Sequence, residues 1–286
     1  MQVSNNSLES LLSYYFKELE NLYDRDEIRS LFITVVEHYL KVDRKYFQFN
    51  LETKVNQREL ILIYNCANEL KSGKPLQYIL NEAWFYNSLF FVNEHVLIPR
   101  PETEELIEII FKDSKTASKI LDIGCGSGCI ILTLKKLIPE ASCTGLDLSK
   151  GALNVTLQNS KKLNLPVSII NADVLELNQL SSQYDLIVSN PPYIKETEKG
   201  SMHKNVLEHE PHLALFVSGE DEIVFYKKII DLCASSLNSG GKLYFELNPL
   251  TANLVLNYAK QSMIFKEIEL IKDINSKDRF FKGIKL

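Results

Sequence analysis

Two short segments carry residue types from which a reaction site could be built. The first, LDIGCGSG at residues 121–128, places glycines directly after an apolar run. Glycines there let the backbone turn sharply, and the helix expected to follow points its free N–H groups at a ligand. Asp147 ends the next apolar run, roughly 20 residues later, where a carboxylate can accept both hydroxyls of a ribose. We expect a nucleoside-type ligand here; a nicotinamide cofactor and a purely structural turn are the alternatives.

The second segment, NPPY, ends another apolar run with two prolines. In DLIVSNPPYIKE, residues 185–196, the prolines cannot continue a central strand because each lacks the N–H that the ladder needs. The stiff turn leaves the side-chain oxygen of Asn190 and the carbonyl of Pro191 as a fixed pair of acceptors, with the flat ring of Tyr193 beside them. Two neutral acceptors match a planar NH2 group. The alternative is a strand-ending turn with a solvated asparagine.

Strand-like and helix-like stretches alternate after residue 118 and fix where both segments lie. The strand-like stretches are KILDIG, SCTGLDL, VSIINAD, YDLIVSN and KLYFEL, and those with a helical pattern are CIILTLKKLI, KGALNVTLQNSKKLNL and EIVFYKKIIDLCASSL. This alternation predicts a parallel sheet with helices on both faces, followed by a final strand pair in the tail. Ligands of such sheets bind beyond the carboxyl ends of the strands, where the strand order reverses. The first and fourth strands flank that point, so residues 124–128 and 190–193 should face each other across one crevice.

The first seventy-odd residues have a helical pattern instead. Apolar residues recur at helical spacing in residues 8–19 and 28–39, and Asp24 or Asp26 can cap the second of these helices. A third helix-like stretch, QRELILIYNCANELKSG, stops at Gly73. We expect a small helical bundle.

A hairpin is expected between the bundle and the sheet. Residues 84–100 are rich in aromatic and β-branched side chains, and the aromatic run at residues 84–86 is expected in the hairpin core. Pro101 suits the first position of a helix whose first turn is acidic.

The overall composition restricts the class of protein. The chain has 286 residues, 45 % hydrophobic and 24 % charged, with a formal net charge of -5, which argues against naked nucleic acid as the main partner. We see no secretory signal and no apolar run long enough to cross a bilayer. The five cysteines lack zinc-finger spacing and are expected as reduced thiols in the cytoplasm. His203, His209 and His212 lack a fitting set of carboxylates or cysteines, so no metal is expected.

NPPY together with DIGCGSG resembles class I S-adenosylmethionine-dependent methyltransferases that act on amino groups, including adenine amino and glutamine amide methyltransferases. VLIPRPETEELIE at residues 96–108 is similar to the segment before the catalytic domain in the HemK/PrmC family, whose members methylate the glutamine of the Gly-Gly-Gln motif in peptide chain release factors. EPHLALFVSGEDEIVFYKKII at residues 210–230 also resembles that family, and the resemblance covers nearly the whole chain.

The resemblance implies three parts and an α/β fold. It implies a helical substrate-recognition domain at residues 1–75, a β-hairpin linker at 76–100 and an S-adenosylmethionine-dependent methyltransferase domain at 101–286. That domain is expected to have the Rossmann-like class I fold, a mostly parallel sheet with a terminal antiparallel strand.

The resemblance also assigns roles by position. The cofactor loop would be Gly124, Cys125, Gly126, Ser127 and Gly128. Asp147 would hold the ribose, and Asp173 with Val174 would border the adenine. Many relatives carry tryptophan where this chain has Val174, which predicts weaker stacking. The substrate glutamine would be held by Asn190, Pro191, Pro192 and Tyr193, with Asn190 also beside the cofactor. Phe85 and Arg100 are expected to help close the pocket.

The expected enzyme is therefore a protein-(glutamine-N5) methyltransferase that acts on release factors. A glutamine methyltransferase of a ribosomal protein and an adenine amino methyltransferase remain alternatives, as does a cofactor-binding protein without catalysis. We expect a cytoplasmic monomer with a protein substrate, no direct nucleic-acid substrate and no membrane partner.

Overall fold

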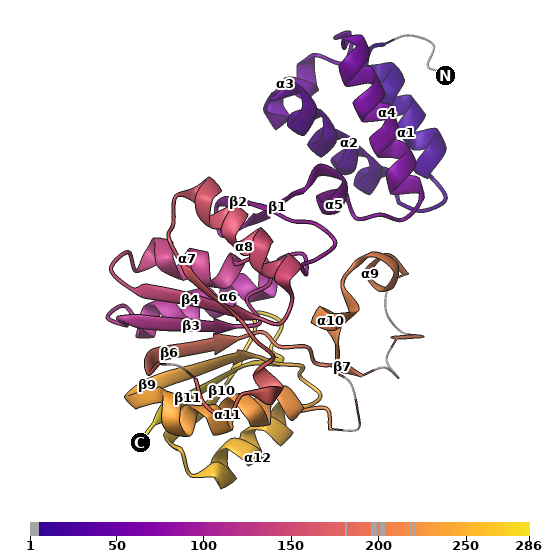
Figure 1. Cartoon of the computed structure of the whole chain (residues 1–286). Coiled ribbons are helices and arrows are strands. Elements are labelled where there is room, and N and C mark those ends of the chain that lie inside the picture. The colour runs from indigo at the N-terminus through magenta and orange to yellow at the C-terminus, as the bar shows by residue number, and fades with distance from the viewer. Residues whose placement is uncertain (1–5, 181, 196–198, 201–203, 218, 220) are drawn as a thin grey trace. The chain divides into compact units, whose positions relative to one another are not determined.

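A computed structural model describes residues 6–180, 182–195, 199–200, 204–217, 219 and 221–286. The chain divides into two compact units, Met1–Asn81 with His203–His209, and Glu82–Met202 with Glu210–Leu286. Figure 1 shows the helices of the first unit and the central sheet of the second. Each unit is described by itself.

The first unit is helical, as its sequence pattern predicts. Its elements are α1 (Leu8–Leu19), α2 (Arg25–Leu40), α3 (Arg44–Phe49), α4 (Gln57–Lys71), α5 (Leu76–Leu80) and α9 (Lys204–His209). Asp24 caps α2 by accepting from the backbone N–H of Glu27, and Asn56 forms a capping box with Glu59 at the start of α4. Tyr15, Phe32 and Phe47 meet edge to face in the core of this unit.

The second unit begins with the expected hairpin, β1 (Glu82–Phe85) paired with β2 (Ser88–Phe91). Tyr86 and Asn87 connect the strands, both with positive φ, as a two-residue turn requires when it matches the twist of the strands. The Tyr86 amide donates to Glu104 Oε1 at 2.8 Å, which ties the turn to the next helix. The expectation that all of residues 84–86 lie in the core is wrong for Trp84, which is 72 % exposed. Successive side chains of a strand point to opposite faces, so burial of Phe85 sends Trp84 outward.

The sheet of this unit has the predicted mixed topology. Among the described residues it has seven strands in the order β10-β11-β9-β6-β3-β4-β5. They are β3 (Lys119–Ile123), β4 (Ser142–Asp147), β5 (Ser168–Asn171), β6 (Tyr184–Ser189), β9 (Leu237–Glu246), β10 (Phe265–Lys272) and β11 (Asp278–Lys285). The five strands from β9 to β5 are parallel, and β11 runs antiparallel between β9 and β10. The order reverses between β3 and β6, so the first and fourth strands of the sheet lie side by side as predicted.

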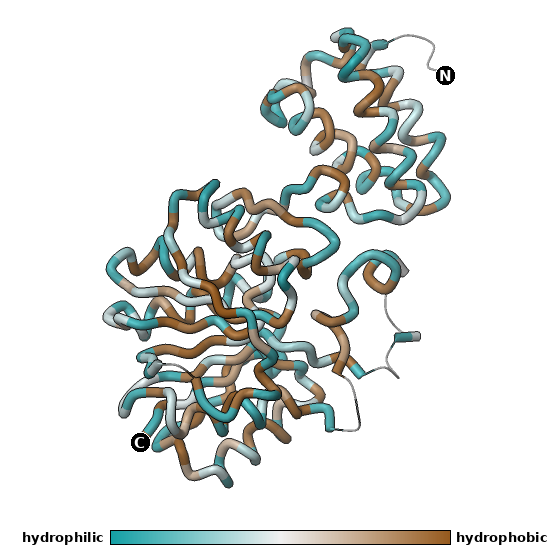
Figure 2. Tube along the Cα trace, viewed as in Figure 1, coloured by the Kyte–Doolittle hydropathy of each residue, from teal (hydrophilic) through white to brown (hydrophobic). Residues whose placement is uncertain are grey.

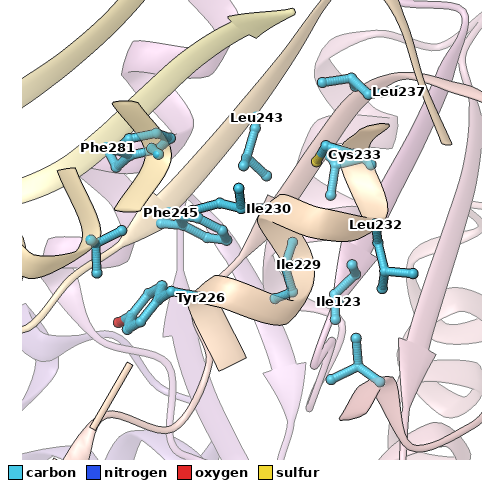
Figure 3. Close-up of a cluster of buried hydrophobic side chains, with 14 of the residues drawn as sticks. Ile123, Tyr226, Ile229, Ile230, Leu232, Cys233, Leu237, Leu243, Phe245 and Phe281 are labelled. Atoms are coloured by element: carbon cyan, nitrogen blue, oxygen red, sulfur yellow. The ribbon is translucent and has the colours of Figure 1, made fainter. Parts of the chain in front are cut away.

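Helices cover both faces of this sheet. They are α6 (Pro101–Asp113), α7 (Cys129–Leu137), α8 (Lys150–Leu163), α11 (Val224–Ser236) and α12 (Ala252–Ser262). On one face α11 packs on the sheet through Tyr226 and Ile230, against Phe245 and Phe281 (Figure 3). Val255 of α12 belongs to the same buried cluster. On the other face α6 and α7 pack with the hairpin. The apolar strands between these layers form the brown centre of the sheet in Figure 2.

Short elements complete the unit at the carboxyl ends of the strands. They are η1 (Val174–Glu176), β7 (Ile194–Lys195), α10 (His212–Leu215) and β8 (Phe216–Val217), and β7 pairs in parallel with β8. Helix α6 begins at Pro101, as its sequence predicts. The strands therefore end among loops and short helices, which leaves room for a site there.

Candidate functional site

The glycine loop after β3 leaves part of its backbone open to a cavity. The amides of Gly124 and Cys125 both donate to the carbonyl oxygen of Leu146, at 2.7 and 3.1 Å, and so fix the loop to the end of β4. Gly124 and Gly126 have φ of 76° and 54°, and no heavy atom of the described residues, other than those of the glycine and its two chain neighbours, lies within 4 Å of a Cβ built on either. Both line a cavity of ≈ 480 Å³, so a ligand can approach their backbone directly.

Gly128 has a different reason to be glycine. Its φ is 79°, and a Cβ there would lie 3.0 Å from side-chain atoms of both Leu132 and Thr156. Gly128 is the N-cap of α7. Because it has no side chain, it lets the helix pack closely, and no side chain caps the first amides of α7. The structure does not place Gly128 among the residues that line the cavity.

Cys125 belongs to the loop but is not suited to act as a nucleophile. Its side chain is buried against Gly145, where a Cβ would lie 2.8 Å from the sulfur. Burial raises the pKa of the Cys125 thiol well above its ordinary value. The protonated sulfur acts as a small filler between the loop and β4.

Asp147 ends β4 at the wall of the same cavity. Its Oδ2 accepts from the amide of Gly126 and its Oδ1 from the amide of Ser149, both at 2.9 Å. Burial raises the pKa of Asp147, and these backbone hydrogen bonds partly oppose that rise. Since each carboxylate oxygen has two acceptor positions, both can still accept from hydroxyl groups of a ligand.

The end of β5 contributes an acidic and an apolar group. Asp173 Oδ1 accepts from the amide of Leu175 at 2.9 Å and thereby caps η1, while Val174 is buried. Both residues line the cavity. They suit the polar edge and the flat face, respectively, of a heterocyclic base.

The NPPY turn lies across the cavity from the glycine loop. Ser189 Oγ donates to the carbonyl oxygen of Ile123 at 2.6 Å, which joins the end of β6 to the end of β3. Beyond it, Asn190, Pro191 and Pro192 line the cavity. Tyr193 packs instead against the core that α11 covers, and burial raises its pKa to about 12. The predicted pairing of the two loops across one crevice is therefore present, with Tyr193 behind the wall.

Asn190 has a buried carboxylate beside it. Ser189 pairs in register with Phe245 of β9, so the next residues along the two parallel strands, Asn190 and Glu246, are neighbours. The Asn190 side chain is close enough to the Glu246 carboxylate to lower the pKa of that group. Thr103 Oγ1 donates to Glu246 Oε2 at 2.7 Å.

A second buried acid lies beneath the glycine loop. Asp122 precedes the loop in β3 and is fully buried, and neither of its carboxylate oxygens has a hydrogen bond of normal geometry within the described residues. Burial, with a smaller contribution from the charge of Asp147, raises the pKa of Asp122 to about 8. Asp122 and Asp147 are therefore neighbouring acids, and a positively charged ligand in the cavity would favour the ionised form of both.

Arg100 is part of the cavity wall and is held by an ion pair. Its Nη2 lies 2.6 Å from Glu210 Oε1, and the side chain of Glu210 is buried. Glu210 also accepts from the amide of Ile98 at 3.4 Å. The pair fixes the segment that precedes α6 to the segment that precedes α10.

Most of the predicted site residues come together at this cavity. Those that line it are Gly124, Cys125, Gly126, Ser127, Asp147, Asp173, Val174, Asn190, Pro191, Pro192 and Arg100. Gly128 and Tyr193 support the wall without lining it. Phe85 does not reach the cavity: it packs against Phe90 in the core under the hairpin, because the strand pleat turns it inward.

Sequence reasoning missed several other residues. His95, Leu97, Leu213, Phe216 and Phe225 also line the cavity. Leu213 and Phe216 lie in the stretch at residues 210–230, whose family resemblance could have indicated them. Glu246 could have been found as an acid at the carboxyl end of a strand.

The predicted absence of a metal site involved His203, which lies outside the described residues. Within the described parts of the chain, no group of three or more His, Cys, Asp or Glu side chains is arranged to hold a metal ion. Nor does any helix there combine the length and apolar character needed to span a membrane.

Comparison with known proteins identifies relatives over most of the chain. The family model described as methyltransferase small domain matches residues 102–230. A release factor glutamine methyltransferase of Flavobacterium psychrophilum is 40 % identical over 273 residues, which are 94 % of this chain and 95 % of that protein. The protein of the same name from Bacteroides thetaiotaomicron is 38 % identical, over 94 % of this chain and 97 % of its own length.

A solved structure has the same fold at low identity. The crystal structure of a methyltransferase from Pyrococcus furiosus aligns with a TM-score of 0.53 and 14 % identity, covering 81 % of this chain and 99 % of that one. Together with the strand order, this likeness shows the class I methyltransferase fold.

Proposed function

The chain belongs to the family of release factor glutamine methyltransferases, and we therefore propose that it transfers a methyl group from S-adenosylmethionine to a glutamine side chain of peptide chain release factors. The glutamine is the one in the Gly-Gly-Gln motif, and the methyl group goes to its amide nitrogen. The observation that supports this most strongly is the pairing of Asn190 and Pro191 with the open glycine loop across one cavity. Such a transfer requires two hydrogen-bond acceptors for the amide NH2 group of the substrate and a loop that can bind the nucleoside part of the cofactor.

The residues of the cavity fit S-adenosylmethionine. Its ≈ 480 Å³ lies within the usual range for small-ligand sites. Gly124 and Gly126 leave space that any Cβ would fill, and the acceptors of Asp147 suit the two ribose hydroxyls. Asp173 and Val174 would border the adenine. When bound, the cofactor supplies an electrophilic methyl group on a sulfonium.

The protein's task in the transfer is positioning, since a carboxamide nitrogen is a poor nucleophile. Its lone pair is delocalised, so it must be aimed at the methyl carbon. Asn190 Oδ1 and the carbonyl of Pro191 would accept the two N–H groups of the glutamine. Because positive charge develops on that nitrogen during transfer, both oxygens would stabilise the transition state more than the ground state.

A neutral acceptor suits position 190 better than a carboxylate. A charge there would attract the sulfonium before the reaction as well as during it, which adds binding without adding rate. The methylated amide loses its extra proton to water, and we assign no general base. The product amide is neutral, so its release breaks no new ion pair.

The remaining parts of the proposal concern partners. We assign the helical residues 1–75 to recognition of the protein substrate and residues 76–100 to a linker before the catalytic residues 101–286. The net charge of -5 supports a protein rather than a nucleic acid as substrate. We place the reaction in the cytoplasm, where release factors act, and the enzyme as a monomer.

The test is the identity of the labelled substrate. The full chain is incubated with methyl-labelled S-adenosylmethionine and, separately, purified release factor, release factor with the motif glutamine replaced by glutamate, ribosomal proteins and unmodified DNA. We expect label on the first alone, located by mass spectrometry at the motif glutamine. Preferential labelling of a ribosomal protein or of adenine would contradict the proposal.

A further inference from the structure

Glu246 is a buried carboxylate next to the proposed substrate-binding residue Asn190. It ends β9, its exposed fraction is 2 %, and it does not line the cavity. Burial raises its pKa, and the hydrogen bond from Thr103, the nearby charge of Arg279 and the Asn190 side chain oppose that rise. Keeping such a group has a desolvation cost, so an apolar residue would suit a purely structural position better.

The side chain of Asn190 has two unlike ends. Oδ1 can only accept hydrogen bonds and Nδ2 can only donate them, and rotation of the amide by half a turn exchanges them without changing its shape. Only the orientation with Oδ1 toward the cavity offers an acceptor to a substrate NH2 group. In the reverse orientation the two N–H groups of Asn190 Nδ2 would face the two N–H groups of the substrate, and no hydrogen bond could form between them.

The strand register brings Glu246 to the group that must be oriented. Glu246 follows Phe245, which pairs with Ser189, so its carboxylate lies beside the Asn190 side chain, which lowers its pKa. An ionised carboxylate can only accept hydrogen bonds, so it favours the orientation of Asn190 that turns Nδ2 toward it and Oδ1 away from it. Thr103 at the start of α6 occupies Glu246 Oε2, which fixes the carboxylate in turn.

We propose that Glu246 is a positioning residue that sets the orientation of the Asn190 amide and so makes it an acceptor for the substrate NH2 group. This inference rests on the proposed function for its catalytic consequence. Its structural part, the orientation of the amide, stands apart from which substrate is methylated.

Glu246→Gln is the informative substitution because glutamine has nearly the same shape as glutamate. We expect the oxygen of the introduced amide to replace Oε2 as the acceptor from Thr103, which turns its NH2 group toward Asn190. The Asn190 amide then rotates and presents Nδ2 to the cavity. We expect S-adenosylmethionine affinity within about twofold of wild type and kcat on release factor lower by about 10- to 100-fold, the loss typical when a group that orients a ligating side chain is removed.

A double-mutant cycle separates orientation from general damage. If Glu246 acts through Asn190, Glu246→Gln should cost little further rate once Asn190→Ala is present. Tyr226→Phe is the matched control, because the Tyr226 hydroxyl donates to the backbone oxygen of Glu246 at 3.0 Å and does not touch its carboxylate. The control should lose some stability and keep kcat.

The pH profile gives a second readout. Protonation of Glu246 removes an acceptor from Asn190, so wild-type kcat should fall at low pH and this acid limb should be absent in Glu246→Gln. The charged and titratable groups that interact electrostatically with Glu246 are Arg279, Glu102, Tyr193, Tyr226 and Cys129. Glu102 is the other carboxyl group of this set, so Glu102→Gln is measured as a control and should keep the acid limb.

The decisive readout does not depend on activity. In 15N spectra the Asn190 NH2 signal, assigned by its loss in Asn190→Asp, should exchange slowly in the wild type and change in Glu246→Gln. An unchanged signal, or additive rate losses in the cycle, would overturn the inference. A wild-type enzyme that labels no release factor but shows the spectral change would contradict the proposed function and leave the orientation of Asn190 by Glu246 supported.

Discussion

The carboxylate of Asp147 accepts a hydrogen bond from the backbone amide of Gly126, with 2.9 Å between Oδ2 and the nitrogen. The residue proposed to bind the ribose thus also fixes the loop proposed to cradle the cofactor. A substitution at Asp147 therefore has two consequences that must be separated.

Asp147→Asn should weaken S-adenosylmethionine binding with little loss of shape. The amide keeps one acceptor but loses the charge that strengthens hydrogen bonds to the ribose hydroxyls, each worth on the order of 1.5–3 kcal/mol. We expect a rise in Kd of at least about tenfold by calorimetry. Ser149→Ala, which leaves the Asp147 carboxylate in place, is the control. Unchanged affinity in a folded Asp147→Asn protein would remove Asp147 from the cofactor site.

Two glycines of the loop should respond differently to alanine. Gly126→Ala puts a methyl group into the open cavity and strains a positive φ, so cofactor affinity should fall by more than tenfold with a stability loss of about 1 kcal/mol. Gly128→Ala instead presses on Leu132 and Thr156, so its main effect should be a stability loss of about 1–3 kcal/mol. Urea unfolding and calorimetry on both variants check this. Equal losses of affinity and stability in the two would contradict the division of roles.

Asp122 should make the stability of the ligand-free protein fall as pH rises. Its pKa is about 8 in the folded chain against 3.8 ordinarily, so the folded state holds the proton more tightly. Its contribution to stability is complete below about pH 4 and is lost as pH rises to about 8, by up to about 1.4 kcal/mol per pH unit.

Asp122→Asn removes this dependence. Its free energy of unfolding should exceed that of the wild type at pH 8, by at least about 1.4 kcal/mol, and the difference should shrink at pH 5. Urea titrations at pH 5, 6.5 and 8 measure it. Glu246 titrates in both proteins and cancels in the comparison, whereas the smaller interaction of Asp122 with the Asp147 charge is lost together with the Asp122 carboxylate. Parallel pH profiles would show that Asp122 is ionised or solvated in the folded chain.

The sequence predicts the framework of this site well, for reasons that are local. Each part of the framework can be recognised from a few neighbouring residues: glycines after a strand, prolines that end a strand, and an acid at the end of the next strand. The rule for alternating strands then places all three at one edge of the sheet. The start of α6 at Pro101 and the cap at Asp24 follow from equally short patterns.

What could not be predicted depends on pairing between distant segments. Glu246 meets Asn190 only because β9 pairs with β6 in one register, and the two residues are far apart in sequence. Phe85 turns into the core and Trp84 outward because the pleat of β1 is set by its packing on α6 and α7. Gly128 has the same residue type as Gly126, and only its neighbours reveal that it serves helix packing.

The most direct test of the account is the rate of methyl transfer to the release-factor glutamine by Asn190→Ala and Asn190→Asp. In both variants the prolines still shape the turn, so cofactor affinity should hold, and in Asn190→Asp it should hold or tighten because a negative charge is added near the sulfonium. The single-turnover rate should fall by about 10²–10³ in Asn190→Ala and should also fall in Asn190→Asp. A rate near that of the wild type in either folded variant, or unfolding of Asn190→Ala, would contradict the claim that Asn190 aims the substrate nitrogen.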